Sequence, residues 1–224
     1  MTNQNDARTV REGTFIRIKA VAGQEKAVAD LLSGAAPLVQ KIEPLTLQWM
    51  ALKSANGNFA IVDFFHDDAG RAAHFAGQVA AVLKQAAPAA VEGGWEKGVV
   101  ANVENSKVLS STVTTDHRNA PTVAVRIDVK AAPGQEEALA AFLTGGASLV
   151  QATEPGTLLW YALRIGKDRF TIFDLFANDA GKAAHFGGQV AAALKAKAPE
   201  LISGGWEGGV VANIQSFTVL SATY

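Results

Sequence analysis

The sequence contains one domain-sized segment twice, and this duplication limits the possible folds more than any other feature. One copy begins at Phe59 and reads FAIVDFFHDDAGRAAHFAGQVAAVL, and the other begins at Phe170 and reads FTIFDLFANDAGKAAHFGGQVAAAL. The offset is 111 residues (154 − 43 for Glu154 and Glu43), and it holds without a gap for His74 and His185 and for the tryptophans. A period near a hundred residues is typical of a whole domain rather than of a solenoid unit.

We therefore expect two tandem domains. The predicted ranges are a disordered tail over residues 1–12, a first domain over 13–111, a linker over 112–122 and a second domain over 123–224.

Each repeat predicts the order strand, helix, strand, strand, helix, strand. In the first repeat a strand lies near Phe15–Lys19, another follows Glu43 because the residue before a proline is biased away from helix, and a third spans Phe59–Phe65. A helix of apolar residues at helical spacing separates the first two strands. The second helix is expected to start after the N-cap Asp67 and to end before Pro88. The segment GGWEKGVVAN and the residues after it are predicted to add one or two strands.

This βαββαβ order is that of a ferredoxin-like sheet with two helices on one face. The strand Phe59–Phe65 is largely apolar on both faces, so the second face needs a partner. We expect an α+β protein in which two tandem ferredoxin-like domains pack sheet to sheet as a barrel-like pseudo-dimer within one chain. Further pairing of chains into a homodimer stays open.

Composition excludes several classes of partner and chemistry. A formal charge of −1 without a lysine or arginine run argues against nucleic acid as a partner. The chain has no cysteine, which excludes disulfides, thiolate catalysis and cysteine metal sites. No apolar segment reaches the roughly 20 residues that span a bilayer. The polar N-terminus lacks the apolar core of a secretion signal, so we expect a cytoplasmic protein without a membrane partner.

Asp63 and Asp174 are the candidate acids, each on an otherwise apolar strand face where an unpaired carboxylate is costly. His74 and His185, on the second helix of each repeat, are their expected partners. A carboxylate fixes the imidazole tautomer and raises its basicity, which suits a general base that removes a phenolic proton. The alternative is a structural hydrogen bond that joins the helix to the sheet.

Tryptophans and amide side chains are the candidate substrate contacts. Indole stacks on flat aromatic ligands and its N–H can hold a quinone oxygen, while a glutamine can orient a carbonyl. The alternatives are a core role for the tryptophans, a boundary position for the glutamines and turns for the asparagines. The set comprises Trp49, Trp160, Tyr161, Gln78, Gln189, Trp95, Trp206, Asn102 and Asn213.

No second histidine or acidic pair at ligand spacing accompanies the two helix histidines, so no metal site is expected. No nucleotide-binding motif is present either. If the protein is an enzyme, it is expected to work without a cofactor, and the substrate itself must supply the reducing power.

The run EPGTLLWYALR, followed by RFTIFDLF and a capped helix with AAHF, resembles the antibiotic biosynthesis monooxygenase domain family of the dimeric α+β barrel superfamily. The resemblance covers most of each repeat. It implies a ferredoxin-like domain that pairs through its sheet, and relatives include quinol and anthrone monooxygenases that use oxygen without flavin, metal or heme. The second repeat is closer to the family pattern, since it has Gly156 and Tyr161 where the first has Leu45 and Met50.

The resemblance extends to a heme-degrading branch, in which the position of His74 and His185 ligates iron. That branch also has an asparagine on the first strand and a tryptophan just before the histidine helix. The stretches FIRIK and FFHDD of the first repeat contain neither residue, so heme degradation is disfavoured.

Three functions follow. The first is a cofactor-independent monooxygenase acting with molecular oxygen on an electron-rich aromatic substrate such as a quinol, an anthrone or a polyketide. The second is a non-catalytic small-molecule-binding or stress-response protein, and the third is a heme-binding protein.

We also expect the pockets of the two repeats to differ, because residues at pocket-prone positions differ. These pairs are Met50 and Tyr161, Val62 and Phe173, and Phe64 and Leu175.

Overall fold

The structure is a computed structural model that describes residues 9–114 and 120–224. Its strands form a closed barrel in the order β1-β3-β2-β8-β5-β7-β6-β4, which confirms the predicted α+β fold class. The predicted tail and linker fall partly on residues 1–8 and 115–119, outside the described residues. Glu12, placed in the tail by the sequence prediction, is instead the first residue of a strand.

The described chain divides into two compact units that do not coincide with the two repeats. Unit 1 comprises residues up to Asn105 together with Thr218–Tyr224, and unit 2 comprises Ser106–Phe217. The last strand of each repeat thus runs from one unit into the other.

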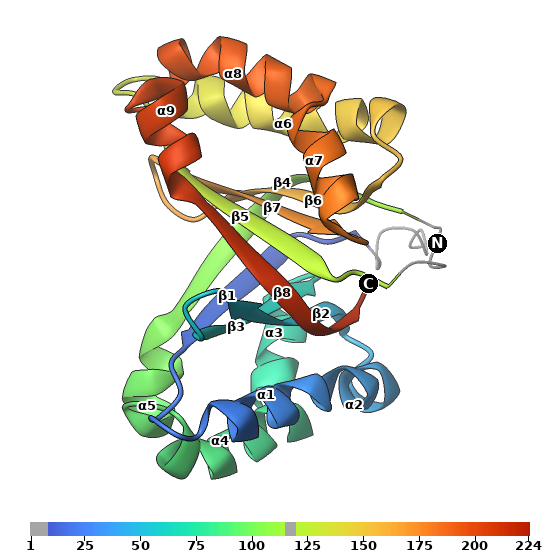
Figure 1. The fold of residues 1–224 in the computed structure, drawn as a ribbon, viewed down its shortest axis with the longest axis vertical. Helices are drawn as coiled ribbons and strands as arrows, with labels where there is room; N and C mark the ends of the chain where they lie inside the picture. Colours follow the sequence, from blue (N-terminus) through green and yellow to red (C-terminus); the bar gives the residue numbers. More distant parts are fainter. Residues whose placement is uncertain (1–8, 115–119) are drawn as a thin grey trace. The chain divides into compact units, whose positions relative to one another are not determined.

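The elements of the first repeat follow the predicted order, with helices broken into shorter pieces (Figure 1). They are β1 (Glu12–Ile18), α1 (Glu25–Ser33), α2 (Ala35–Ile42), β2 (Thr46–Ser54), β3 (Phe59–Phe65), α3 (Asp68–Phe75), α4 (Gln78–Ala90), α5 (Gly94–Gly98), η2 (Val100–Asn102) and β4 (Val103–Val113).

The second repeat has the same order, except that one unbroken helix replaces α1 and α2. Its elements are β5 (Val123–Lys130), α6 (Glu136–Thr153), β6 (Thr157–Arg164), β7 (Arg169–Phe176), α7 (Asp179–Phe186), α8 (Gln189–Leu201), α9 (Gly205–Gly209), η3 (Val211–Asn213) and β8 (Ile214–Thr223).

Local chemistry explains where the histidine helices start. The Asp67 side chain accepts a hydrogen bond from Gly70 N–H, which confirms the predicted N-cap, and Asn178 accepts one from Gly181 N–H in the second repeat. An aspartate in the first turn of each helix favours its positive end.

The structure corrects one sequence prediction and adds detail to another. The helix was expected to end before Pro88, but α4 includes Pro88 in its last turn and ends at Ala90, and α8 includes Pro199 in the same way. The segment GGWEKGVVAN and the residues after it were predicted to add one or two strands, and this part of the chain supplies one, β4. It forms α5 and η2 first, because Gly93 and Gly94 adopt positive φ angles of 79° and 63° and turn the chain there.

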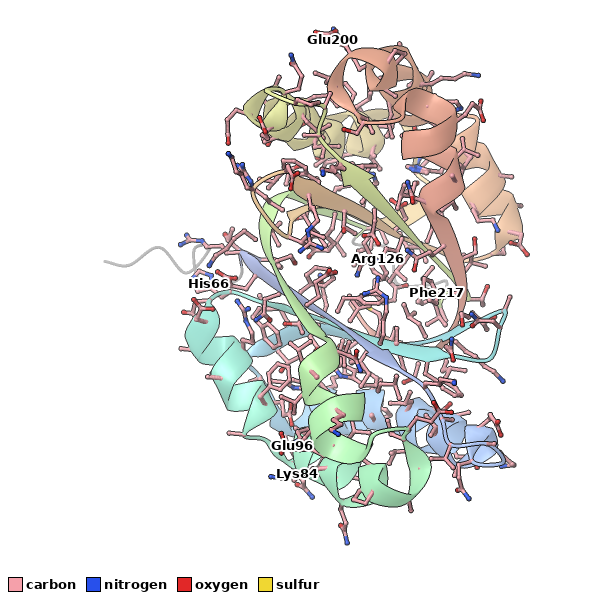
Figure 2. All side chains as sticks on the ribbon, turned by 90° about the vertical axis from the view of Figure 1, so that its left-hand side faces the viewer. His66, Lys84, Glu96, Arg126, Glu200 and Phe217 are labelled. Atoms are coloured by element: carbon pink, nitrogen blue, oxygen red, sulfur yellow. The ribbon has the colours of Figure 1, made fainter. Side chains whose placement is uncertain are left out.

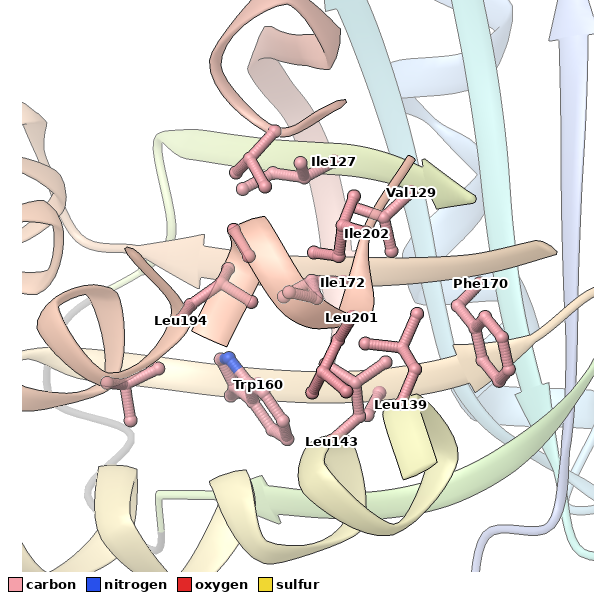
Figure 3. Close-up of a cluster of buried hydrophobic side chains, with 14 of the residues drawn as sticks. Ile127, Val129, Leu139, Leu143, Trp160, Phe170, Ile172, Leu194, Leu201 and Ile202 are labelled. Carbon is pink, nitrogen blue, oxygen red and sulfur yellow. The ribbon is translucent and has the colours of Figure 1, made fainter. Parts of the chain in front are cut away.

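In each unit the helices cover one face of the three-stranded part of the sheet. In unit 2, α6 and α8 lie side by side over β5, β7 and β6 (Figure 1). Figure 3 shows Trp160 among Leu143, Ile172 and Leu194 in the apolar core between these layers. Trp49 and Ile61 belong to the corresponding core of unit 1.

The opposite face of the sheet in unit 2 carries a charged cluster that the sequence did not predict. Arg126 on β5, labelled in Figure 2, is buried and lies 2.7 Å from Asp128 Oδ1. Thr171 Oγ1 donates to the same oxygen at 2.6 Å, and Gln215 Nε2 donates to Asp128 Oδ2 at 3.1 Å. Hydrogen bonds of this kind offset the cost of burying a guanidinium.

Candidate functional site

His74 lies between two buried carboxylates. Its Nδ1 is 2.5 Å from Glu43 Oε2, and its Nε2 is 3.7 Å from Asp63 Oδ1. Thr46 Oγ1 lies 3.2 Å from the same Nδ1. The imidazole is 6% exposed and packs against the rings of Phe65 and Phe75, both with centroids 5.7 Å away. The predicted aspartate and histidine are therefore brought together, and a glutamate joins them.

The second repeat reproduces this geometry. His185 Nδ1 is 2.5 Å from Glu154 Oε2, and His185 Nε2 is 3.8 Å from Asp174 Oδ1. Thr157 Oγ1 lies 3.3 Å from His185 Nδ1. We call the two arrangements the Glu-His-Asp clusters, one formed by Glu43, His74 and Asp63 and one by Glu154, His185 and Asp174.

Sequence reasoning missed the glutamates, because it interpreted the Glu-Pro pair only as the start of a strand. Glu43 follows the last residue of α2, and its Oε1 accepts a hydrogen bond from Val79 N–H at the start of α4. Glu154 binds Val190 N–H at the start of α8 in the same way. Each glutamate therefore connects the histidine to a helix N-terminus, where negative charge is favoured. The sequence signal that could have identified these glutamates is that Glu43 recurs as Glu154 at the same offset as the histidines.

The glycine before α4 and α8 is needed for this contact. A Cβ at Gly77 would lie 2.6 Å from Glu43 Oε1, and one at Gly188 would lie 2.5 Å from Glu154 Oε1. A side chain at either position would displace the carboxylate. Gly187, one residue earlier, has only a 3.4 Å contact with a backbone oxygen, and Ala76 occupies the matching position of the first repeat.

Replacing Gly188 with alanine is therefore expected to lower the free energy of unfolding by about 2 kcal/mol, because Glu154 would lose charge-assisted hydrogen bonds. Urea denaturation of the full chain measures this change. Gly187→Ala is the matched control and is expected to leave stability equal or slightly higher, since alanine favours helix. Equal effects of the two variants would show that the carboxylate position does not depend on the glycine.

Asp63 and Asp174 are fully buried, and neither carboxylate has a hydrogen-bond partner among the described residues. Burial raises the pKa of Asp63 from 3.8 to about 7, while the nearby His74 lowers it and Glu43 raises it. Burial likewise raises the pKa of Asp174 to about 7, while the nearby His185 lowers it and Glu154 raises it. A carboxyl with a pKa near 7 can both accept and release a proton at neutral pH.

Each unit has an apolar cavity on the helix side of its sheet, and no residue of the Glu-His-Asp clusters lines it. In unit 1 a cavity of about 180 Å³ is lined by Trp49, Ile61 and Val79 among others. Trp49 pairs directly with Asp63 across β2 and β3, so their side chains share one face of the sheet. In unit 2 a cavity of about 240 Å³ is lined by the matching Trp160, Ile172 and Val190.

The indole nitrogens at these cavities are unusual. Trp49 Nε1 and Trp160 Nε1 are buried and have no hydrogen-bond partner among the described residues. Since a buried indole N–H normally finds an acceptor, each of these tryptophans has an unpaired donor.

The other predicted contact residues lie away from these cavities. Gln78 and Gln189 are exposed at the first position of α4 and α8. Tyr161 is buried on the face of β6 opposite to Trp160. The pairs expected to make the pockets unequal, such as Met50 and Tyr161, are on that opposite face and do not line the two cavities.

The outer tryptophans and the asparagines have contacts of their own. Trp95 and Trp206 are half-buried at the edge of the core. Lys84 Nζ, on the residue labelled in Figure 2, lies 5.9 Å from the ring centroid of Trp95. Lys195 Nζ lies 5.8 Å from the ring centroid of Trp206. Asn102 Nδ2 donates to the carbonyls of Lys97 and Gly98. Asn213 Nδ2 binds the matching carbonyls of α9. The asparagines thus terminate short helices.

The arrangement does not favour heme ligation through His74 or His185, because both ring nitrogens of each histidine face a carboxylate. Over residues 9–114 and 120–224, no group of three or more histidine, aspartate or glutamate side chains has a geometry that could hold a metal ion. Within the same ranges, no helix has both the length and the apolar character to cross a membrane.

Comparison with known proteins identifies the fold. No protein-family model and no curated protein matches the sequence. A candidate monooxygenase from Fusobacterium nucleatum has a TM-score of 0.79 at 16% identity, covering 96% of this chain and 94% of the other. A ferredoxin-fold protein related to antibiotic biosynthesis monooxygenases, from Listeria monocytogenes, has a TM-score of 0.50 at 10% identity, covering 96% and 98%.

A protein of unknown function from Nitrosomonas europaea is 41% identical over 46% of this chain and 94% of its own, with a TM-score of 0.43. The full-length matches establish that the chain has the tandem ferredoxin-like fold of proteins related to antibiotic biosynthesis monooxygenases.

Proposed function

We propose that this chain, which has the tandem fold of proteins related to antibiotic biosynthesis monooxygenases, is a cofactor-independent oxygenase of hydroxylated aromatic compounds. The observation that carries the proposal is the pairing, in both repeats, of a Glu-His-Asp cluster with an apolar cavity that has a tryptophan wall. A structure of an anthrone oxidase-like protein shares the fold, with a TM-score of 0.53 at 11% identity over 97% of this chain and 94% of the other.

The polar groups beside each cavity suit a phenol or the enol form of an anthrone. The apolar wall with its tryptophan would hold the ring. Asp63 or Asp174 would accept the phenolic proton, since a carboxylate with a pKa near 7 is matched to that task.

The histidine and glutamate would act behind the aspartate. When Glu43 accepts a hydrogen bond from Nδ1 of neutral His74, Nε2 keeps its lone pair and faces Asp63 across 3.7 Å. The proton can then pass from the aspartate to the imidazole, and Glu43 stabilises the imidazolium that forms. The role of base thus belongs to the aspartate and histidine together.

Oxygen chemistry then follows from the substrate anion. The phenolate or enolate passes one electron to O₂, and the resulting radical pair combines to form a carbon–oxygen bond. Loss of water from the peroxide gives the carbonyl product. For an anthrone the balance is one CH₂ group and one O₂ converted to one C=O group and one H₂O.

Oxygen uptake tests this proposal. With a panel of dihydroquinones, naphthols and anthrones, the full chain is expected to consume oxygen without added flavin, nicotinamide or metal, and in the presence of a chelator. The base must be ionised to act, so kcat is expected to rise with pH through an inflection near 7, the raised pKa of Asp63 and Asp174. Absence of uptake with every compound would refute the proposal.

A second function, a non-catalytic small-molecule-binding protein, is favoured by one specific observation. Neither His74 nor Asp63 is among the residues that line the cavity of unit 1, and the same is true of His185 and Asp174 in unit 2. Binding of an aromatic compound without oxygen uptake would support this alternative.

A further inference from the structure

The two cavities occupy matching places in the repeats but differ in volume, at about 240 Å³ in unit 2 and about 180 Å³ in unit 1. Residues at two positions that correspond between the repeats account for the difference in volume. Gly146 and Ala193 line the larger cavity, and Ala35 and Val82 line the smaller one. Phe142 is larger than its counterpart Leu31, so the extra volume arises in spite of it.

Gly146 lies directly against the tryptophan of the larger cavity. A Cβ at this position would be 2.5 Å from Trp160 Cη2 and 2.8 Å from Cζ2, closer than atoms in folded proteins approach. Gly146 therefore lets α6 run unbroken over the indole ring. In the first repeat, Ala35 occupies the position, and the helix is divided at Gly34 into α1 and α2.

We propose that Gly146 is the specificity-determining residue that allows the unit 2 cavity to accept a fused two-ring aromatic compound, while the unit 1 cavity accepts a single ring. The inference rests on the proposed function only in taking the cavities as ligand sites. A closed apolar cavity of about 150 Å³ is large enough to bind benzene. The unit 1 cavity is close to that size, and the unit 2 cavity is larger by about one further fused ring.

The chemistry of the cavity narrows the ligand class further. Its lining residues are glycine, aliphatic or aromatic, and Trp160 Nε1 is buried rather than exposed to the cavity. A ligand that fills it should therefore be largely apolar and flat enough to lie against the indole ring. Half-buried Phe142, Leu149 and Ala193 and exposed Gly145 line the cavity, so it reaches solvent between α6 and α8. A naphthol has the required apolar fused-ring shape.

Calorimetric titration of the full chain with 1-naphthol under anaerobic conditions tests this proposal, since it measures binding in the absence of oxygenation. The wild type is expected to bind one equivalent. Gly146→Ala is expected to weaken binding about tenfold or more, because one methyl group in an apolar pocket discriminates by this order. Gly208→Ala is the control, since Gly208 on α9 does not line either cavity and a Cβ there meets nothing within 4 Å, and its affinity is expected to equal that of the wild type.

Ala193→Val provides a second route to the same result, because it introduces the valine of the first repeat from α8 without altering α6. It is expected to weaken 1-naphthol binding at least fivefold while circular dichroism stays unchanged. Wild-type affinity in both Gly146→Ala and Ala193→Val, or absence of 1-naphthol binding to the wild type, would overturn the proposal. Binding with the expected variant pattern but without oxygen uptake would leave it intact and refute only the oxygenase function.

Discussion

Replacing Asp63 and Asp174 together with asparagine is expected to lower kcat for oxygen uptake by roughly 10² to 10⁴-fold, the usual contribution of a general base. Asparagine has nearly the same shape as a protonated aspartate, so the buried sites should keep their packing. KM is expected to change little, because the apolar wall holds the substrate. Steady-state oxygen consumption with the best substrate of the panel measures both constants.

The control for the double variant of Asp63 and Asp174 is Asp179→Asn. This change removes an exposed carboxylate at the start of α7 and is expected to leave kcat unchanged. The single variants Asp63→Asn and Asp174→Asn then report which repeat turns over each substrate. If the double variant retains wild-type kcat and the pH inflection near 7, the aspartates are not the base.

Replacing Glu154 with alanine is expected to lower the free energy of unfolding by about 3–5 kcal/mol. This is the usual loss when one partner of a buried charged pair is removed and the other stays buried. Glu154 accepts two contacts at once, from His185 Nδ1 at 2.5 Å and from Val190 N–H at 3.1 Å. Urea denaturation followed by circular dichroism measures the loss.

Two further variants separate charge from shape at this position. Glu154→Gln keeps an oxygen for Val190 N–H and is expected to be less destabilising than Glu154→Ala. Glu207→Ala removes an exposed carboxylate on α9 and is expected to change stability by less than about 0.5 kcal/mol. A Glu154→Ala loss no larger than that of Glu207→Ala would show that the Glu154–His185 contact contributes nothing to folding.

The sequence alone determined the fold class, because two independent periodicities agreed within a duplicated segment. Alternation along Phe59–Phe65, helical spacing around it and the N-cap Asp67 all specify local structure through contacts with near neighbours. The sequence also indicated that Asp63 and Asp174 need buried partners, because a lone carboxylate on an apolar face is costly. The structure places His74 and His185 beside them.

Only the tertiary structure revealed the glutamates and the cavities. Glu43 and His74 are 31 residues apart and lie on different elements, so their 2.5 Å contact depends on how α3 and α4 pack beside the end of α2. The difference in volume between the two cavities depends on the distance between α6 and the Trp160 ring. A Cβ at Gly146 would meet this ring, whereas one at the neighbouring Gly145 would meet nothing within 4 Å, and the sequence does not distinguish the two glycines. Local patterns determine which element a residue joins, whereas packing between elements decides which side chains meet.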